Sequence, residues 1–409
     1  MQVYLVGGAV RDAALGLPVR ERDWCVTGTT PEAMADRNYR PVGKDFPVFL
    51  HPETGEEYAL ARTERKTAAG YHGFAFNTSP DVTIEEDLER RDLTVNAMAR
   101  DTDGHLVDPY GGMQDLENRV LRHVSDAFIE DPVRILRVAK FAARFRSLGF
   151  TIADETLALM RRMVEDGEVD ALVPDRVWRE TETALGASDS RVFFETLRDC
   201  GALKVVFPEI DALFGVPQRK DYHPEVDTGL HTMMVLEQAE RLSPDPDVRF
   251  AALVHDLGKA TTRQQDLPSH PGHEGRGRKL VLKMAERLPL PKSHRDLGMV
   301  VAEYHLHCHR AFELKAATLL KVIEACDGFR RPERFEKFLL CCEADARGRT
   351  GFETRDYPQA DYFRAAYAAA SAIDAGGIAA DNRGRDIPAA IRKARVAAID
   401  TVKRAQTSR

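Results

Sequence analysis

The chain has 409 residues, of which 43% are hydrophobic and 30% charged, and its formal net charge is −7 at pH 7. This length predicts more than one domain, and no apolar run is long enough to cross a membrane. The first residues read as a strand rather than a cationic targeting segment, and the six cysteines form no Cys-x-x-Cys zinc pattern, so a reduced cytoplasmic setting is expected.

The N-terminal segment predicts a turn that binds phosphate. Residues 3–6 form a short apolar strand that runs into Gly7 and Gly8, and Arg11 follows about one helical turn later. Glycines let the backbone approach a ligand closely, and the amides at a helix start point toward negative charge. The pattern is therefore typical of a loop that cradles phosphates.

Two carboxylates, Glu21 and Asp23, follow with one residue between them. If this segment is a strand, residues two apart face the same side, so both side chains converge while Trp24 faces away. Magnesium binds through one or two carboxylates together with substrate phosphates, and paired ions can activate a hydroxyl and stabilise a leaving pyrophosphate. Beside the glycine turn, this pair predicts Mg2+-dependent nucleotidyl transfer.

These motifs resemble the head of the class II tRNA nucleotidyltransferases, the CCA-adding enzymes of the polymerase β-like superfamily. The run 90–97 resembles the family's RRDxTxNA element, and the resemblance implies that Gly8, Arg11 and Arg91 bind the nucleotide. Glu21 departs from the Asp-x-Asp pair usual in the family but keeps its charge. A third carboxylate is expected on a later strand, and three residues are candidates for it: Glu56, Glu57 and Asp92.

Four charged residues recur at every third position from residue 131: Asp131, Arg134, Arg137 and Lys140. Proline after an acidic residue predicts a helix start here, on which consecutive members of the row are neighbours. Such a stripe is usually the solvated side of a helix. The resemblance instead implies a nucleotide template, in which Asp131 accepts from the amine of cytosine or adenine and Arg134 donates to the ring nitrogen. Lys140 stands where the family usually has arginine.

A second constellation, with the order His231, His255-Asp256 and Asp345, resembles the HD phosphohydrolase superfamily. Imidazoles and carboxylates can hold a divalent metal and generate a hydroxide nucleophile. The resemblance implies a transition ion, with Ni2+ as the candidate, and catalytic roles for His255 and Asp256. Alternate spacing does not put His305, His307 and His309 on one helical face, so at most one or two of them are expected to be ligands. His305 is the expected ligand because it follows an apolar helix that points back toward the domain.

An HD domain behind a CCA-adding head resembles the multifunctional CCA proteins. The expected fold is α+β and multidomain: a polymerase β-like α/β nucleotidyltransferase head, an all-α neck and body, and an all-α HD domain. The expected boundaries are 1–118 for the head, 119–215 for the neck and body, 225–350 for the HD domain and 351–409 for a basic helical tail. That tail is expected either to dock on the HD domain or to contact tRNA.

The resemblance implies addition of CCA to the tRNA 3′ end from CTP and ATP, by a monomer or homodimer without a membrane partner. It also implies 2′,3′-cyclic phosphodiesterase, 2′-nucleotidase and phosphatase activities of the HD domain. A poly(A) polymerase, a CC-only or A-only enzyme and a non-catalytic tRNA-binding protein are the alternatives, and the HD part could be a scaffold with vestigial hydrolysis. The negative net charge does not exclude RNA, since a local basic stripe suffices.

Overall fold

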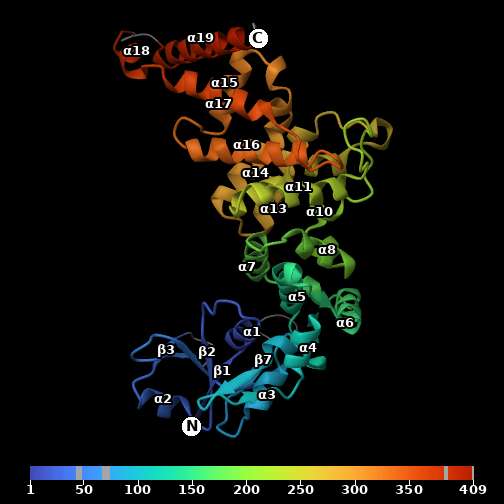
Figure 1. Ribbon diagram of the computed structural model, residues 1–409, viewed down its shortest axis with the longest axis vertical. Helices are drawn as coiled ribbons and strands as arrows, with labels where there is room; N and C mark the ends of the chain where they lie inside the picture. Colours follow the sequence, from blue (N-terminus) through green and yellow to red (C-terminus); the bar gives the residue numbers. More distant parts are fainter. Residues whose placement is uncertain (43–47, 67–73, 382–385, 408–409) are drawn as a thin grey trace. The chain divides into compact units, whose positions relative to one another are not determined.

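The computed structural model describes residues 1–42, 48–66, 74–381 and 386–407. The chain divides into two compact units, Met1–Val206 and Phe207–Arg409. The first contains a mixed β-sheet followed by helices, and the second is built from helices (Figure 1). The expected α+β multidomain class is confirmed.

A mixed sheet forms the centre of the N-terminal part, with the strand order β3-β4-β5-β2-β1-β8-β9 in the described residues. β1 is antiparallel to β2 and β8, whereas β2 is parallel to β5. Its strands are β1 (Gln2–Val6), β2 (Asp23–Thr27), β3 (Arg40–Val42), β4 (Val48–Leu50), β5 (Glu57–Leu60), β8 (Ala99–Asp101) and β9 (Leu106–Val107). A separate hairpin consists of β6 (Thr63–Lys66) and β7 (Phe74–Asn77).

Alternation along the strands divides the apolar side chains between the two faces of this sheet. Val6, Cys25 and Ala99 belong to one buried cluster, and Val26 and Leu60 to another. The helices of this part are α1 (Gly8–Ala14), α2 (Pro31–Ala35), α3 (Ile84–Glu89) and α4 (Gly112–Asn118). α1 starts directly after β1, which brings the glycine pair to the end of that strand.

The rest of the first unit is mainly helical and centres on α5 (Val133–Phe145), which packs against α7 and α8. α5 buries an apolar face that includes Ile135, Val138 and Ala142, as its periodicity predicts. Its other helices are α6 (Asp154–Glu165), α7 (Pro174–Leu185), α8 (Arg191–Asp199) and α9 (Ala202–Val206). A short parallel pair, β10 (Val120–Leu121) and β11 (Thr151–Ile152), adds two strands to a segment expected to be entirely helical.

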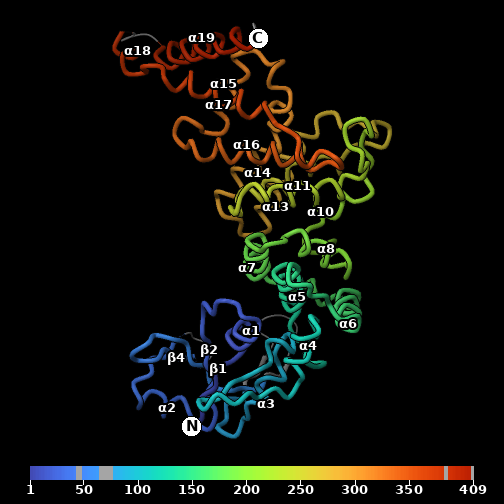
Figure 2. Tube along the Cα trace, viewed as in Figure 1, coloured from blue at the N-terminus to red at the C-terminus, as the bar shows by residue number. Residues whose placement is uncertain are grey.

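The second unit is a set of packed helices (Figures 1 and 2). They are α10 (Pro208–Asp211), α11 (Thr228–Leu242), α12 (Pro246–Val254), α13 (His273–Arg287), α14 (Lys292–His309), α15 (Ala316–Ala325), α16 (Pro332–Arg347), α17 (Pro358–Ser371), α18 (Ala375–Asp381) and α19 (Ile387–Thr407). A 3-10 helix, η5 (Leu257–Thr261), follows α12. In the ranges that are described, no helix combines the length and apolarity needed to cross a bilayer.

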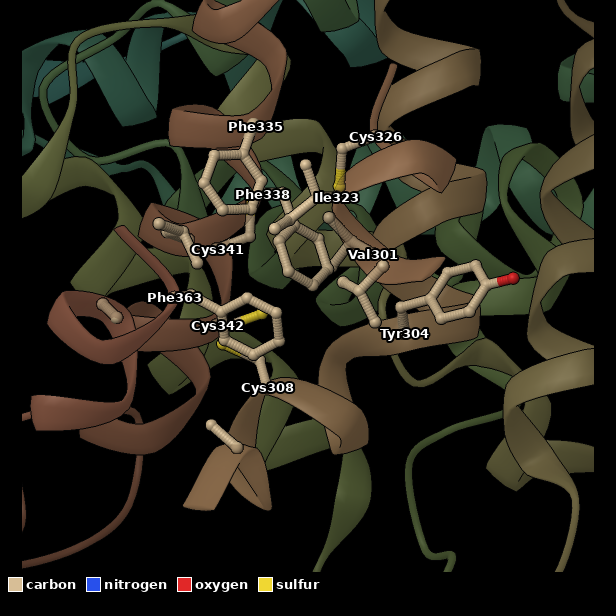
Figure 3. Close-up of a cluster of buried hydrophobic side chains, with 14 of the residues drawn as sticks. Val301, Tyr304, Cys308, Ile323, Cys326, Phe335, Phe338, Cys341, Cys342 and Phe363 are labelled. Atoms are coloured by element: carbon tan, nitrogen blue, oxygen red, sulfur yellow. The ribbon is translucent and has the colours of Figure 1, made fainter. Parts of the chain in front are cut away.

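The core of this unit joins the central helices to the C-terminal ones. Cys308, Cys342 and Phe363 lie together in this core, from α14, α16 and α17 (Figure 3). α19 packs on α15 and α17 and contributes the fully buried Ile399. The basic C-terminal helix is therefore docked, which is one of the two arrangements that the sequence left open.

Candidate functional site

The glycine turn before α1 is built closely around an arginine. Gly7 has φ 65° and ψ −123°, a conformation open to glycine and costly for other residues. A Cβ on Gly7 would lie 2.8 Å from Nη1 of Arg91, whereas one on Gly8 would lie 3.5 Å from its nearest neighbour, Nη2 of Arg11. Gly7 is thus needed for both its backbone angles and the space it leaves to Arg91.

Asp23 begins β2, and Glu21 lies before the strand rather than in it. The strand argument for the pair was therefore wrong for Glu21, although both carboxylates share one neighbourhood. Burial raises the pKa of Asp23, and the charge of Glu21 raises it further, while that of Arg91 lowers it. Trp24 faces the other side, as expected: its Nε1 donates to Glu56 at 3.0 Å.

The strand register distinguishes the candidates for a third carboxylate. Glu57 on β5 is the direct partner of Asp23 on the parallel strand, so both side chains leave the same face of the sheet. Glu56 accepts from Trp24 on the opposite face. Asp92 is buried and accepts from the backbone N–H of Leu93 and from Asn96. Glu57 is the candidate that the register places beside Asp23.

Arg91 is held toward the turn by a buried carboxylate on α3. Its Nη2 lies 3.1 Å from Asp87, which also pairs with Arg90 at 2.7 Å. Burial acts to raise the pKa of Asp87, but the two guanidinium groups outweigh it and lower this pKa to about 2. Asp87 is therefore ionised at neutral pH, and its pairing keeps the Arg91 guanidinium near both the glycine turn and Asp23.

Arg11 has a different environment from the one expected for a nucleotide ligand. It is only 3% exposed, donates from Nε to Asp12 at 2.8 Å, and also bonds Asn96. Its guanidinium lies 5.0 Å from the ring centres of both Phe141 and Phe145 on α5. In this conformation Arg11 connects α1 to α5 within the protein interior.

The first two members of the charged row already have protein partners. Asp131 precedes α5 instead of lying on it, and Arg176 on α7 donates to both of its oxygens, at 3.0 and 2.7 Å. Arg134 is buried on α5 and donates to the backbone carbonyls of Ala127 at 2.6 Å and Arg90 at 2.5 Å. These bonds fix the orientation of the Asp131 carboxylate and of the Arg134 guanidinium.

The other two members of the row point to different elements. Arg137 pairs with Asp92 of the RRD element at 2.7 Å, which links α5 to the segment after α3. Lys140 pairs with Glu180 on α7 at 2.5 Å. Burial lowers the pKa of Lys140, and the neighbouring Glu180 opposes that effect. The row therefore spreads around the helix, as a three-residue spacing requires.

In the second unit the four predicted HD residues meet in the interior, each at most 3% exposed. His231 Nε2 lies 3.2 Å from Asp345 Oδ1, and His255 Nε2 lies 3.1 Å from Asp256 Oδ2. His231 comes from α11, His255 and Asp256 follow α12, and Asp345 comes from α16. Side chains from α11, from α16 and from the segment after α12 thus converge on one point.

The donor set fits a cation. Nδ1 of His255 lies 2.7 Å from the carbonyl of Ala252, and Nδ1 of His231 lies 2.9 Å from that of Gly348. A carbonyl only accepts, so each Nδ1 carries a proton; without an ion each Nε2 can donate to the adjacent carboxylate, and as a neutral imidazole it can ligate a metal. Burial acts to lower the pKa of His255, but Asp256 and Asp345 outweigh it and raise this pKa. Imidazoles and carboxylates that face one another in the interior are a ligand set that suits a divalent transition ion.

Three family models match this chain in order. The poly A polymerase head domain covers residues 3–122, the probable RNA and SrmB-binding site of polymerase A covers 149–214, and the HD domain covers 228–333. The Multifunctional CCA protein of Thioalkalivibrio sulfidiphilus is 64% identical over 404 residues, which is 98% of this chain and 99% of that protein. The chain belongs to the multifunctional CCA protein family.

Solved CCA-adding enzymes share the fold of this chain. The Thermotoga maritima CCA-adding enzyme complexed with tRNA_CCA matches 99% of this chain and 91% of its own, with a TM-score of 0.63 at 19% identity. A CCA-adding enzyme with CTP matches 98% and 87% of the two chains, with a TM-score of 0.65 at 20% identity. At these identities the likeness concerns the fold.

Around the HD centre, sequence reasoning missed four residues: His223, Glu225, His273 and His309. Nδ1 of both His223 and His231 lies 3.0 Å from Glu225, the residue at which the HD domain was expected to begin. Nε2 of His309 lies 2.6 Å from Asp345. His273 lies against His305, Nε2 to Nε2 at 3.4 Å. The sequence shows all of these histidines, but among the later ones it predicted only His305 as a further ligand.

Proposed function

We infer that this chain rebuilds the 3′-terminal CCA of tRNA from CTP and ATP with release of pyrophosphate, and that its HD domain hydrolyses phosphate esters. The observation that supports the first activity best is the cluster of Gly7, Arg91 and Asp23 at the end of β1, since it combines a phosphate-sized backbone turn, a cation and a carboxylate. Family membership over nearly the whole chain supports both activities.

We propose Glu21 and Asp23 as the magnesium ligands, with Glu57 as a third carboxylate beside them. Magnesium held there would neutralise phosphate charge during displacement of pyrophosphate. Gly8 offers close backbone approach to the triphosphate, and Arg91 supplies a guanidinium that can bind its oxygens in a fork. Arg11 supports this turn from behind through Asp12 and Asn96, which is a positioning role rather than a direct contact.

Base recognition is proposed for Asp131 and Arg134. Cytosine and adenine each present an amine beside an unprotonated ring nitrogen, so the carboxylate accepts and the guanidinium donates. Uracil and guanine present the opposite pattern, and each buried group left unpaired costs about 1–3 kcal/mol. A guanidinium carries five N–H groups, so donation from Arg134 to a base does not require both of its carbonyl bonds to break.

Arg137 and Lys140 are proposed to act around the nucleotide through their ion pairs. Arg137 orients Asp92, whose carboxylate can accept from a ribose hydroxyl, and Lys140 joins α5 to α7 through Glu180. Lysine is a point charge without the planar fork of arginine, and a single carboxylate oxygen at 2.5 Å suits it.

For the HD domain we propose that His231, His255, Asp256 and Asp345 hold a divalent transition ion, with Ni2+ as the candidate. Such an ion would supply Lewis acidity toward a phosphoryl oxygen and toward water. Lys259 lies 2.6 Å from Asp256, and it brings a cation close to where a phosphate would bind. The proposed substrates are 2′,3′-cyclic phosphates, 2′-nucleotides and simple phosphomonoesters.

The proposed partners are the tRNA 3′ end, CTP and ATP, and the proposed location is the cytoplasm. All six cysteines are buried free thiols, which is consistent with a reducing compartment. Arg144 and Arg146, which are exposed at the end of α5, would contact phosphates despite the negative net charge of the whole chain.

The decisive test uses full-length protein, magnesium and tRNA that lacks its 3′ CCA, with products resolved to single nucleotides. CTP alone should give two additions, and CTP with ATP should give three and then stop. A long ladder of A residues would mean a poly(A) polymerase, and a stop after two additions with both nucleotides would mean a CC-only enzyme. No extension by a folded protein would refute the transferase activity.

A further inference from the structure

The connection between α10 and α11 contains a closed loop, residues 216–228. The backbone N of Gln218 donates to the carbonyl of Val226 at 2.8 Å, and that of Thr228 donates to Val216 at 3.0 Å. The two ends of the loop therefore pair with each other, which closes the loop at its base. A loop that is fixed in this way can present its tip to a ligand in a defined position.

One residue of the loop is held in a strained backbone conformation. Val226 has φ 59°, which is a true outlier for a β-branched residue. Its N donates to the carbonyl of His223 at 2.9 Å, and its own carbonyl accepts from Gln218, so bonds within the loop keep it there. Strained residues persist where their surroundings over-determine them, and they gather at ligand-binding sites. The outlier indicates a loop held in one shape, as a binding loop is.

The tip of the loop, residues 219–224, presents an aromatic ring and positive charge to solvent. Tyr222 is 58% exposed, the highest value among the large hydrophobic side chains in the described residues. The guanidinium of Arg219 lies over its ring, 5.2 Å from the ring centre, and pairs with Asp221 at 3.2 Å. Lys220 beside them is exposed as well. An aromatic ring with an arginine is a combination on which proteins stack bases, because every base has a π face.

The loop holds this ring close to the HD residues. Nη1 of Arg349 donates to the carbonyl of Tyr222 at 3.4 Å, and Nη2 of the same guanidinium lies 3.4 Å from Asp345. A single side chain thus connects the backbone at Tyr222 to a residue of the HD centre. The ring of His223, the next residue, packs on that of His231 with the ring centres 4.6 Å apart. A nucleotide whose phosphate lies at the HD residues therefore has its base within reach of Tyr222.

We propose that Tyr222, with Arg219 over its ring, is a subsite for the base of the phosphate ester that the HD domain hydrolyses. The ligand is a nucleoside that carries a 2′,3′-cyclic phosphate or a 2′-phosphate. Stacking accepts any base, so the subsite selects nucleotides over other phosphate esters without selecting one base. The identity of the ester rests on the proposed hydrolase function, whereas the binding of a base stands on the loop.

The test compares two substrates of the full-length chain with Ni2+. One is a nucleoside 2′,3′-cyclic phosphate, and the other is methyl riboside 2,3-cyclic phosphate, the same ester with a methoxy group in place of the base. Initial rates give kcat and KM for each, and the ratio of the two kcat/KM values isolates the effect of the base. Tyr222→Leu should lower this ratio about tenfold, mainly through KM of the nucleotide, and Tyr222→Phe should keep it. Tenfold corresponds to about 1.4 kcal/mol, within the range for stacking of one base.

Leu230→Ala is the matched control. Leu230 is 51% exposed and directly precedes His231, but it has no aromatic face, so its loss should leave the ratio unchanged. Circular dichroism checks that each variant is folded. An unchanged ratio in folded Tyr222→Leu, or an equal fall in Leu230→Ala, would overturn the subsite and leave the hydrolase function standing.

If wild type hydrolyses neither substrate, the hydrolase function is rejected and calorimetry decides the subsite on its own. A nucleoside 2′-monophosphate should then bind wild type about tenfold more tightly than Tyr222→Leu. Methyl riboside 2-phosphate is the reference without a base, and its affinity should not depend on the ring. Equal affinities of wild type and Tyr222→Leu for the nucleotide would overturn the subsite.

Discussion

Replacing Gly7 by alanine tests whether the turn before α1 is built around Arg91. The variant forces a Cβ onto a residue with φ 65° and ψ −123°. That Cβ would lie 2.8 Å from Nη1 of Arg91, which is closer than a real Cβ contact allows. Arg91 is the far end of a flexible side chain, so we expect it to move while the backbone of the turn stays strained.

The expected destabilisation follows from these two effects. Holding alanine in such a backbone conformation costs on the order of 1–3 kcal/mol. Displacing Arg91 weakens its 3.1 Å ion pair with Asp87 and adds roughly 1 kcal/mol or less, since the Arg91 side chain is 21% exposed. For a unit of about this size each kcal/mol lowers the melting temperature by roughly 2–4 °C.

Gly8→Ala is the matched control. A Cβ there would meet its nearest neighbour, Nη2 of Arg11, at 3.5 Å, an ordinary contact. Gly8 is the first residue of α1, and alanine in a helix is favoured over glycine by about 0.5–1 kcal/mol. We expect Gly8→Ala to keep or slightly raise stability, yet to reduce nucleotide addition because the methyl group occupies the approach of the triphosphate.

The assay is urea denaturation followed by tryptophan fluorescence. The chain has two tryptophans, Trp24 and Trp178, and both lie in the first unit, so the signal reports unfolding of Met1–Val206 alone. Gly7→Ala should lower the midpoint clearly and Gly8→Ala should not. Equal midpoints for Gly7→Ala and wild type, or an equal loss in both variants, would refute the reasoning from the backbone angles and the Arg91 contact.

Three further predictions follow from the sites. Asp23→Ala should abolish CCA addition and leave cyclic-phosphate hydrolysis unchanged, while His255→Ala should do the opposite; loss of both activities in either folded variant would contradict separate centres. Glu57→Gln should reduce the rate of nucleotide addition roughly tenfold to a hundredfold, the loss usual when a residue that supports a metal site is removed. Glu56→Gln should reduce the rate little, and initial rates at saturating tRNA measure both. The folded-state pKa of Asp87 is about 2, below its ordinary value of 3.8, so its contribution to stability is complete above about pH 4 and is lost as the pH falls toward 2. Asp87→Asn should therefore be less stable than wild type at pH 7, and urea midpoints of the two should converge in acid; a constant difference would show that the charge of Asp87 is not the cause.

Local patterns in the sequence identified the elements that carry the candidate sites. A strand ending in two glycines, proline at the start of α5, and the apolar helix before His255 and Asp256 each have a local physical cause. The convergence of His231, Asp256 and Asp345 was expected from the resemblance, and the structure brings them together. The roles of these residues are still proposals.

Long-range partners could not be predicted in the same way. Nothing near Arg11 in the sequence shows that Asn96 and Phe145 surround it, and periodicity does not tell a solvated arginine from a buried one. The strand register that sets Glu57 beside Asp23 depends on a parallel pairing between distant segments. His273 lies near Asp256 because the backbone of Gly258 packs directly against that of His273, and a pattern of side chains does not reveal such a contact.

The pairing of the charged row with protein partners has a consequence for base selection. Asp131 and Arg134 are held by Arg176 and by backbone carbonyls, so neither is left unpaired when no nucleotide is bound. In the proposed role, a base must compete with Arg176 for Asp131, whereas Arg134 can donate to the base while it keeps a carbonyl bond. Cytosine and adenine match both groups, because they present an amine that donates to Asp131 and a ring nitrogen that accepts from Arg134.

Uracil and guanine present an acceptor to the Asp131 carboxylate and a donor to the Arg134 guanidinium, so the internal bonds are retained and the base is left unpaired. If Asp131 and Arg134 read the base as we propose, selection would come from competition with bonds that the folded chain already makes, and the wrong base would lose about 1–3 kcal/mol for each mismatched group.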